Sequence, residues 1–267
     1  MNTMPTLFLS HGSPMLAIRP SPARAFLADL GTSLPRPEAI VLVSAHWESL
    51  GGPAVSTAAA PDTIHDFGGF PQALFDIRYP APGAPKLAAR IAALLESEGL
   101  AVKTSATRGL DHGAWVPLSL MYPEAGIPVT QLSLMRGATP EAHHRMGQSL
   151  RALRDEGVLV IGSGSMTHNL HEFRGQDLDA AAPGWVSEFN RWMQTRLEAG
   201  DAGALLDYRA QAPSAARNHP TEEHIAPLFV AMGAAGAQAQ ARRIHGSFEH
   251  SVLSMDAYIF DSKPNLL

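Results

Sequence analysis

Five short apolar runs, separated by stretches of helical periodicity, constrain the fold of this chain more than any other feature. The runs are Thr6–Ser10, Ala39–Ala45, Ala101–Thr104, Pro128–Leu134 and Val158–Gly162. Unbroken apolar runs of this length are typical of strands that are covered on both faces. Amphipathic helices are predicted at Lys86–Ser97, Pro140–Glu156, Pro183–Ala199 and Glu222–Met232. The alternation predicts an α/β fold: a single three-layer domain over residues 1–267, with a mostly parallel central sheet and helices on both faces.

The C-terminal region differs from this pattern. The segment "HGSFEHSVLSMDAYIF" holds two β-rich pieces close together, which predicts a C-terminal β-hairpin or edge strands. No internal repeat and no low-complexity linker interrupts the chain.

The segment 51–85 is rich in Pro and Gly and shows little periodicity. Loops of this length in a compact domain are usually functional or disordered. The aromatic residues Phe67, Phe70, Phe75 and Tyr79 favour an ordered, functional loop. We expect the part around Asp62–Pro82 to cover the site and to supply aromatic walls.

Charge and cysteine content limit the classes of function. The chain carries 20 basic and 25 acidic residues without a run of Lys or Arg, which argues against nucleic acid or an anionic membrane as a partner. It has no cysteine, so any transition metal would need His, Asp or Glu as ligands. No signal peptide or membrane span is evident, and a cytoplasmic location is expected. A monomer and a homo-oligomer both remain open.

Three of the apolar runs are followed by Ser and His: "LFLSHGSP" (His11), "IVLVSAHW" (His46) and "VLVIGSGSMTHNL" (His168). In open α/β sheets, ligands gather beyond the carboxyl ends of the strands, so these imidazoles are expected to share one site. Neutral imidazoles bind Zn²⁺ and Fe²⁺ well, and three of them leave coordination positions open for substrate. The small residues at 162–165 are expected to let the backbone approach the pocket closely.

Two further segments carry candidate residues. "RGLDHGAWVPL" holds His112 beside Asp111, and "NHPTEEHIAPLF" holds His219 and His224 at an expected helix start. A helix N-terminus explains the acidic pair Glu222 and Glu223 in the latter, but not its histidines. His65 could line the pocket from the long loop. The remaining histidines are expected to be surface or packing residues: His143, His144, His171, His245 and His250.

Eight motifs then occur in a fixed order: "SHGSPM", "SAHWE", "HDFGGFP", "YPAPGAP", "LDHGAWVPL", "MYPEAGIPV", "GSGSMTHNL" and "HPTEEHIAPLF". Together they resemble the DODA-type extradiol aromatic ring-opening dioxygenases, which are LigB-like class III enzymes. The resemblance runs from about Pro5 to Gly236. It implies an α/β fold, one divalent metal ion per chain (Zn²⁺ or Fe²⁺), and O₂-dependent ring cleavage of a small aromatic diol such as 4,5-DOPA.

The same resemblance assigns roles by position. His11 and His46 match metal ligands, and His224 falls at the third-ligand position, where LigB enzymes carry a glutamate before a Gly-Ala pair. His219, Glu222 and Glu223 remain rivals for that position. His168 matches the catalytic acid/base, and His112 matches a pocket histidine near substrate or O₂. His219, His65 and Phe67 complete the predicted set as substrate contacts.

Three other interpretations fit parts of the pattern. A metal-dependent hydrolase could use Glu222 or Glu223 as the base for attack by zinc-bound hydroxide. A non-enzymatic metal-binding protein would not need His168 or His112. A serine nucleophile in "GSGSM" only loosely matches G-x-S-x-G, because the second glycine is misplaced.

Overall fold

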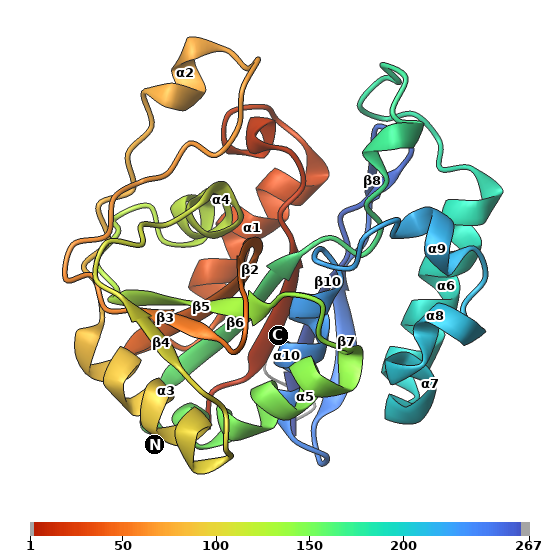
Figure 1. Cartoon of the computed structure of the whole chain (residues 1–267). Coiled ribbons are helices and arrows are strands. Elements are labelled where there is room, and N and C mark those ends of the chain that lie inside the picture. Colours follow the sequence, from red (N-terminus) through yellow and green to blue (C-terminus); the bar gives the residue numbers. More distant parts are fainter. Residues whose placement is uncertain (1–2, 263–267) are drawn as a thin grey trace.

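The computed structural model describes residues 3–262. Its main sheet has eight strands in the order β4-β3-β5-β2-β6-β1-β10-β7 (Figure 1). The strands are β1 Thr6–Ser10, β2 Ala39–Ser49, β3 Ala54–Ser56, β4 Lys103–Ser105, β5 Val129–Met135, β6 Val158–Gly164, β7 Gln240–His245 and β10 Ala257–Asp261. The pairs β1–β6, β2–β6, β2–β5 and β3–β4 are parallel, which confirms the predicted fold class.

The five predicted strands correspond to β1, β2, β4, β5 and β6. Strand β2 runs four residues past its predicted end and carries a register shift between Val43 and Glu48. Strand β10 lies in the segment that the sequence predicts to be β-rich, whereas its antiparallel partner β7 lies almost entirely before that segment and had no sequence prediction. Since β10 also pairs with β1, β7 forms this edge of the sheet and β10 does not. Between β7 and β10, β8 (Phe248–Glu249) and β9 (Leu253–Ser254) form a separate antiparallel hairpin, which lies inside the segment predicted to contain one.

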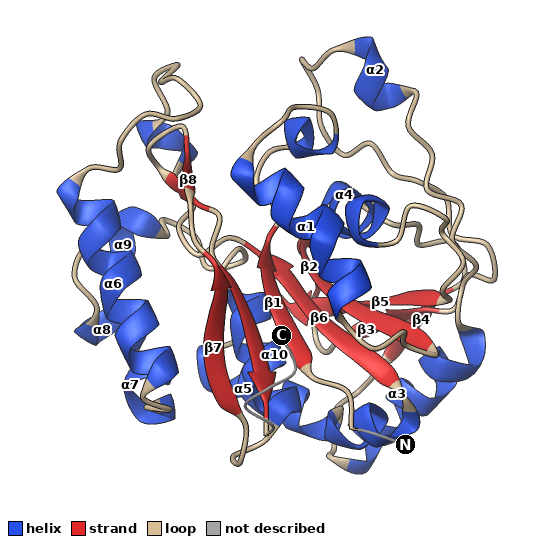
Figure 2. Ribbon diagram, turned by 180° about the vertical axis from the view of Figure 1, so that it is seen from behind, coloured by secondary structure: helices blue, strands red, loops and turns tan. Residues whose placement is uncertain are grey.

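Successive side chains of the central strands pack into the core layers on opposite faces of the sheet, because side chains alternate in direction along a β-strand. Ile40 and Leu42 pack with α1 (Pro22–Ser33) and α4 (His112–Met121) on one face. Val41 and Val43 pack on the other face with α3 (Pro85–Ser97), α5 (Pro140–Ser149) and α10 (Ala226–Ala235). Figure 2 shows helices on both sides of the sheet. A third core lies where α6 (Gly184–Glu198) and α10 meet β1 and β10.

Two predicted helices differ in their boundaries. Pro140–Glu156 divides into α5 and the 3-10 helix η2 (Arg151–Glu156), which ends at Gly157 with φ +77°. The helix expected at Glu222–Met232 begins instead at Ala226 and ends at Ala235. Pro227 explains this start, because a residue without an N–H is favoured in the first turn. His224 therefore lies in the turn before α10.

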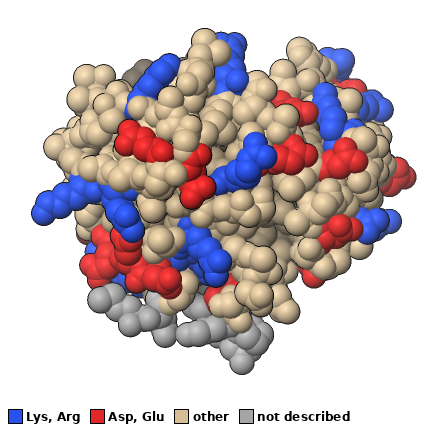
Figure 3. Space-filling view, turned by 60° about the horizontal axis from the view of Figure 1, so that its bottom comes forward, with Lys and Arg blue, Asp and Glu red and all other residues tan. Residues whose placement is uncertain are grey.

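Several elements had no sequence prediction: α1, β3, β7, the 3-10 helices η1 (Pro14–Ala17) and η3 (Leu170–Glu172), and the helices α2 (Gln72–Phe75), α7 (Ala202–Leu206), α8 (Tyr208–Gln211) and α9 (Ala215–Asn218). None of the helices within residues 3–262 combines the length and apolar character needed to cross a bilayer. On the face drawn in Figure 3, basic and acidic side chains are interspersed.

Candidate functional site

Three adjacent parallel strands, in the order β2-β6-β1, end on the same side of the sheet. His11 follows the last residue of β1, and His46 lies in the extended part of β2. Ser10 pairs with Gly164 and Ser44 pairs with Ser163, so the ends of the three strands are level. The prediction that these motifs meet at one edge agrees with this register.

His224 reaches the same place from the turn before α10. Its carbonyl accepts a hydrogen bond from the backbone N–H of Ser165 at 2.8 Å, which ties the turn to the end of β6. A Cβ on Gly164 would lie 2.0 Å from that carbonyl, so only glycine permits this contact. The close backbone approach predicted for residues 162–165 thus exists, but it is made to the turn at His224 and not to the pocket.

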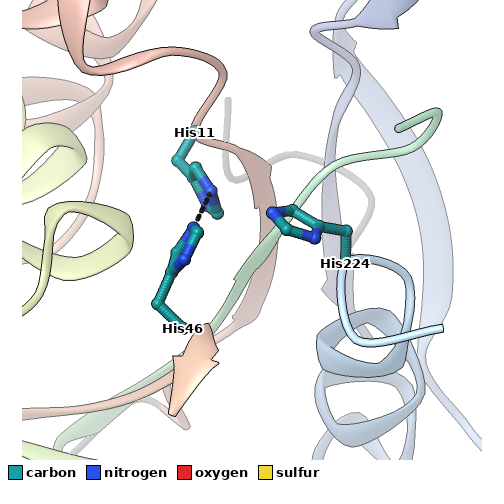
Figure 4. A group of neighbouring side chains, drawn as sticks. All are labelled: His11, His46 and His224. Carbon is teal, nitrogen blue, oxygen red and sulfur yellow. Dashed lines mark hydrogen bonds between the residues drawn. The ribbon is translucent and has the colours of Figure 1, made fainter. Parts of the chain in front are cut away.

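The rings of His11, His46 and His224 point toward one another (Figure 4). Nε2 of His11 is 3.0 Å from Nε2 of His46. One nitrogen from each of the three rings lies within 4.8 Å of a nitrogen of each of the other two. Each Nδ1 faces an acceptor. For His11 it is the Ser163 hydroxyl (3.0 Å). For His46 it is Asp66 Oδ2 (3.6 Å), and for His224 it is Glu223 Oε1 (2.9 Å).

These partners determine the tautomers. The Ser163 hydroxyl donates to the Gly113 carbonyl, so it must accept from Nδ1–H of His11. The carboxylates of Asp66 and Glu223 likewise favour a proton on Nδ1 of His46 and His224. This leaves the Nε2 lone pairs of the three rings directed at one another. Converging lone pairs repel each other and attract a cation. Metal-binding histidines characteristically donate their other N–H to such an acceptor, so this donor set fits a divalent metal ion.

Burial keeps the three rings neutral. It lowers the pKa of His11 and of His224 well below the ordinary 6.5, and the neighbouring histidines lower both further. Burial and then His112 lower the pKa of His46 to about 4, against the opposing effect of Asp111 and Asp66. Neutral imidazole is the form that binds a metal.

Asp66, which the sequence analysis missed, links the long loop to the site. One of its oxygens accepts from both the backbone N–H and the Nδ1 of His112, each at 2.9 Å, and the other faces His46. Burial raises the pKa of Asp66, but the hydrogen bonds and charge of His112 outweigh it and bring the pKa to about 2. Its position in the motif "HDFGGFP" was the available signal.

Asp111 is fully buried beneath the site. It accepts from Ser44 (2.7 Å) and Gln131 (2.8 Å) and pairs with Arg108. The Ser44 hydroxyl in turn accepts from the backbone N–H of His46 at 3.1 Å. Asp111 therefore joins the start of α4 to β2 and helps to fix His46 and His112 in place.

His168 lies against the triad without belonging to it. Its ring stacks on that of His224 with centroids 3.5 Å apart and planes 5° from parallel. Its backbone N–H donates to the Asn218 carbonyl at 3.0 Å. Burial lowers the pKa of His168 to about 4; Glu223 opposes this shift and His112 adds to it.

Two predicted substrate contacts do not fit the observed placement. His219 is completely buried and donates from Nε2 to the Met166 carbonyl at 2.9 Å. His65 Nε2 contacts the Ile77 carbonyl, and its ring packs behind Phe67. Neither lines the cavity described next, because each ring is held by a backbone carbonyl away from it.

A cavity of about 700 Å³ opens over the histidines. His46, His112, His168 and His224 line its polar end. The rest of the wall is largely apolar, and Phe67, Phe70 and Pro71 come from the long loop, as expected. Phe75 packs behind Phe67. Leu170 and Phe173, which are 58% and 42% exposed, contribute to the cavity wall from the segment that follows β6.

The acidic rivals for the third metal position have other partners. Glu223 accepts from Nδ1 of His224 and from Thr221, and Glu222 pairs with Arg209. A carboxylate so engaged is poorly placed as the free base of a hydrolase. Ser163, buried between Gly113 and His11, is equally unsuited as a nucleophile.

The comparisons with known proteins agree with this geometry. The family described as the catalytic LigB subunit of aromatic ring-opening dioxygenase matches residues 5–260. The chain belongs to the LigB family.

Named relatives cover nearly the whole chain. The 4,5-DOPA dioxygenase extradiol of Beta vulgaris is 45% identical over 98% of both chains, and the Escherichia coli K12 protein of that name is 42% identical over 86% of this chain and 85% of its own. A crystal structure of an uncharacterized Escherichia coli K12 protein superposes with a TM-score of 0.79 at 34% identity, covering 96% of this chain and 99% of that one. This LigB-family chain is therefore a metal-dependent extradiol ring-cleavage dioxygenase.

Proposed function

We propose that this enzyme cleaves the ring of a catechol such as 4,5-DOPA with O₂, and that His11, His46 and His224 hold one divalent ion for the reaction. One observation carries the assignment of the ligands: three neutral imidazoles, each with Nδ1 directed at an acceptor, present their Nε2 atoms to a common point beneath an aromatic-walled cavity. We further propose that residues 1–267 act as one catalytic domain.

The all-imidazole donor set suits either Zn²⁺ or Fe²⁺ and departs from the two-His-one-carboxylate arrangement. When bound, the ion supplies Lewis acidity and a template on which the diol and O₂ meet. Among the chain's own carboxylates, Glu223 accepts from Nδ1–H of His224, and Asp66 faces Nδ1 of His46 at 3.6 Å, so both help to orient the rings.

His168 and His112 supply the proton chemistry in this proposal. The neutral ring of His168 lines the cavity and can accept a catechol proton at a ring nitrogen and return it as the ring opens. His112 donates from Nδ1 to Asp66, so its Nε2 is an acceptor for a substrate hydroxyl. The apolar wall with Phe67 and Phe70 holds the aromatic ring and excludes water.

The test has two stages. Metal analysis of protein purified without added metal identifies the resident ion, and O₂ uptake is then measured with L-DOPA and protocatechuate. Oxygen consumption with a yellow product supports the proposal. Metal-dependent turnover of an ester or amide without O₂ uptake would favour a hydrolase, and bound metal with no turnover of any catechol would favour a metal-binding protein.

A further inference from the structure

A polar corner of the cavity takes no part in the chemistry described above. Among the residues that line the cavity, Arg19 is the one permanently charged side chain. It belongs to the segment that leaves β1 at His11, and Gly12, Ser13 and Met15 of that segment line the wall between them. The guanidinium has no hydrogen-bond or ion-pair partner among the described residues.

A small recess of about 10 Å³ adjoins the cavity at this corner. Ser13, Met15, Arg19 and His250 line both spaces, so the recess is a side pocket of the cavity. Its volume suits a single group the size of a water molecule. An ammonium group has this size.

Glu249, on strand β8, lines the recess. The residue is only 5% exposed, and its buried Oε1 has no hydrogen-bond partner in the described structure. Oε2 lies behind the cavity wall, 3.6 Å from the place where a side chain on Gly12 would begin. Buried carboxylates are normally paired, so an unpaired one beside a ligand cavity indicates a missing cation.

We propose that Arg19 and Glu249 recognise the charged side chain of an α-amino acid catechol. Arg19 pairs with the carboxylate, and Glu249 receives the ammonium group in the recess, while the diol lies at the histidine end of the cavity. This assignment rests on the proposed function and names the two side chains that bind the charged part of the substrate. Two opposite charges that line the same recess match the adjacent carboxylate and ammonium of an amino acid.

Four catechols separate the two contacts: L-DOPA carries both charges, 3-(3,4-dihydroxyphenyl)propionate only the carboxylate, dopamine only the ammonium, and 4-methylcatechol neither. We expect Arg19→Gln to lower the kcat/KM ratio of L-DOPA to dopamine by about tenfold or more. Glu249→Gln, which preserves side-chain shape, is expected to lower the ratio of L-DOPA to the propionate by about as much. Arg24→Gln is the matched control, because Arg24 lines neither space.

Anaerobic calorimetric titration of the metal-loaded protein with the same compounds gives a readout that does not need turnover. Substrate-selective weakening of binding supports the assignment even if no catechol is cleaved, in which case only the proposed function fails. Equal losses for all four catechols in both variants would overturn it. So would lower thermal stability with unchanged ratios, since this would show that Arg19 and Glu249 have a structural role only.

Discussion

His219 and His224 lie five residues apart, both are almost fully buried, and burial lowers the pKa of both. They differ in which nitrogen is engaged. His219 uses Nε2 on the Met166 carbonyl, whereas His224 uses Nδ1 on Glu223 and keeps Nε2 for the site. Burial and residue type alone therefore do not distinguish a ligand from a packing residue. The position of the acceptor distinguishes them.

The largest expected difference between the two is in metal content. His224→Ala should reduce bound metal from about one ion per chain to almost none and abolish O₂ uptake, because one of three converging imidazoles is lost. His11→Ala and His46→Ala should behave in the same way. Elemental analysis with circular dichroism separates metal loss from unfolding. Full metal occupancy in any of the three would defeat the assignment.

His168 tests whether a ring stacked on a proposed ligand is itself a ligand. His168→Ala should keep the metal and lose about 10²–10⁴-fold in kcat, the usual contribution of a general acid–base group. His168→Gln should behave similarly, since an amide cannot carry the proton. The measurement is steady-state O₂ uptake beside metal content. If the metal is released, His168 belongs to the ligand set.

Glu223 tests the acceptor itself. Glu223→Gln should weaken metal affinity by about 10–100-fold while leaving the three imidazoles in place. Competition with a chromophoric chelator measures this. Glu222→Gln is the matched control, because Glu222 pairs with Arg209 and touches no site histidine. Equal effects of the two substitutions would show that only the local charge matters.

The smallest expected effect on the metal site concerns His219, which instead contributes to the pH dependence of stability. Burial lowers its folded-state pKa to about 4, so below about pH 6.5 the unfolded chain binds a proton that the folded protein does not. The free energy of unfolding should therefore fall by up to about 3 kcal/mol as the pH drops from 6.5 to 4.

His219→Gln should remove this component and retain near-normal metal content. Urea unfolding at several pH values, with a chelator present in every sample, compares the two proteins without a contribution from metal binding. An identical pH dependence in wild type and variant would show that His219 is solvated in the folded state.

Much of the fold followed from local pattern. Apolar runs of five to seven residues become central strands because both faces of a parallel sheet must be covered, and β1, β5 and β6 lie within two residues of their predicted bounds. Helix boundaries near proline were less accurate, since Pro227 acts on the first turn only. The short β3 and the small helices between α6 and α10 lack any strong periodicity.

The sequence by itself determined the residue types of the site and their places at strand ends, because parallel strands bring their carboxyl ends to one edge. Only the tertiary structure decided which nitrogen of each histidine faces that edge. The nitrogen is set by three acceptors. Asp66 comes from the long loop and Ser163 from the neighbouring strand β6, whereas Glu223 directly precedes His224 in the chain. A hydrogen bond to one ring nitrogen depends on a few ångströms of backbone placement, and the spacing of residues along the chain does not encode that distance.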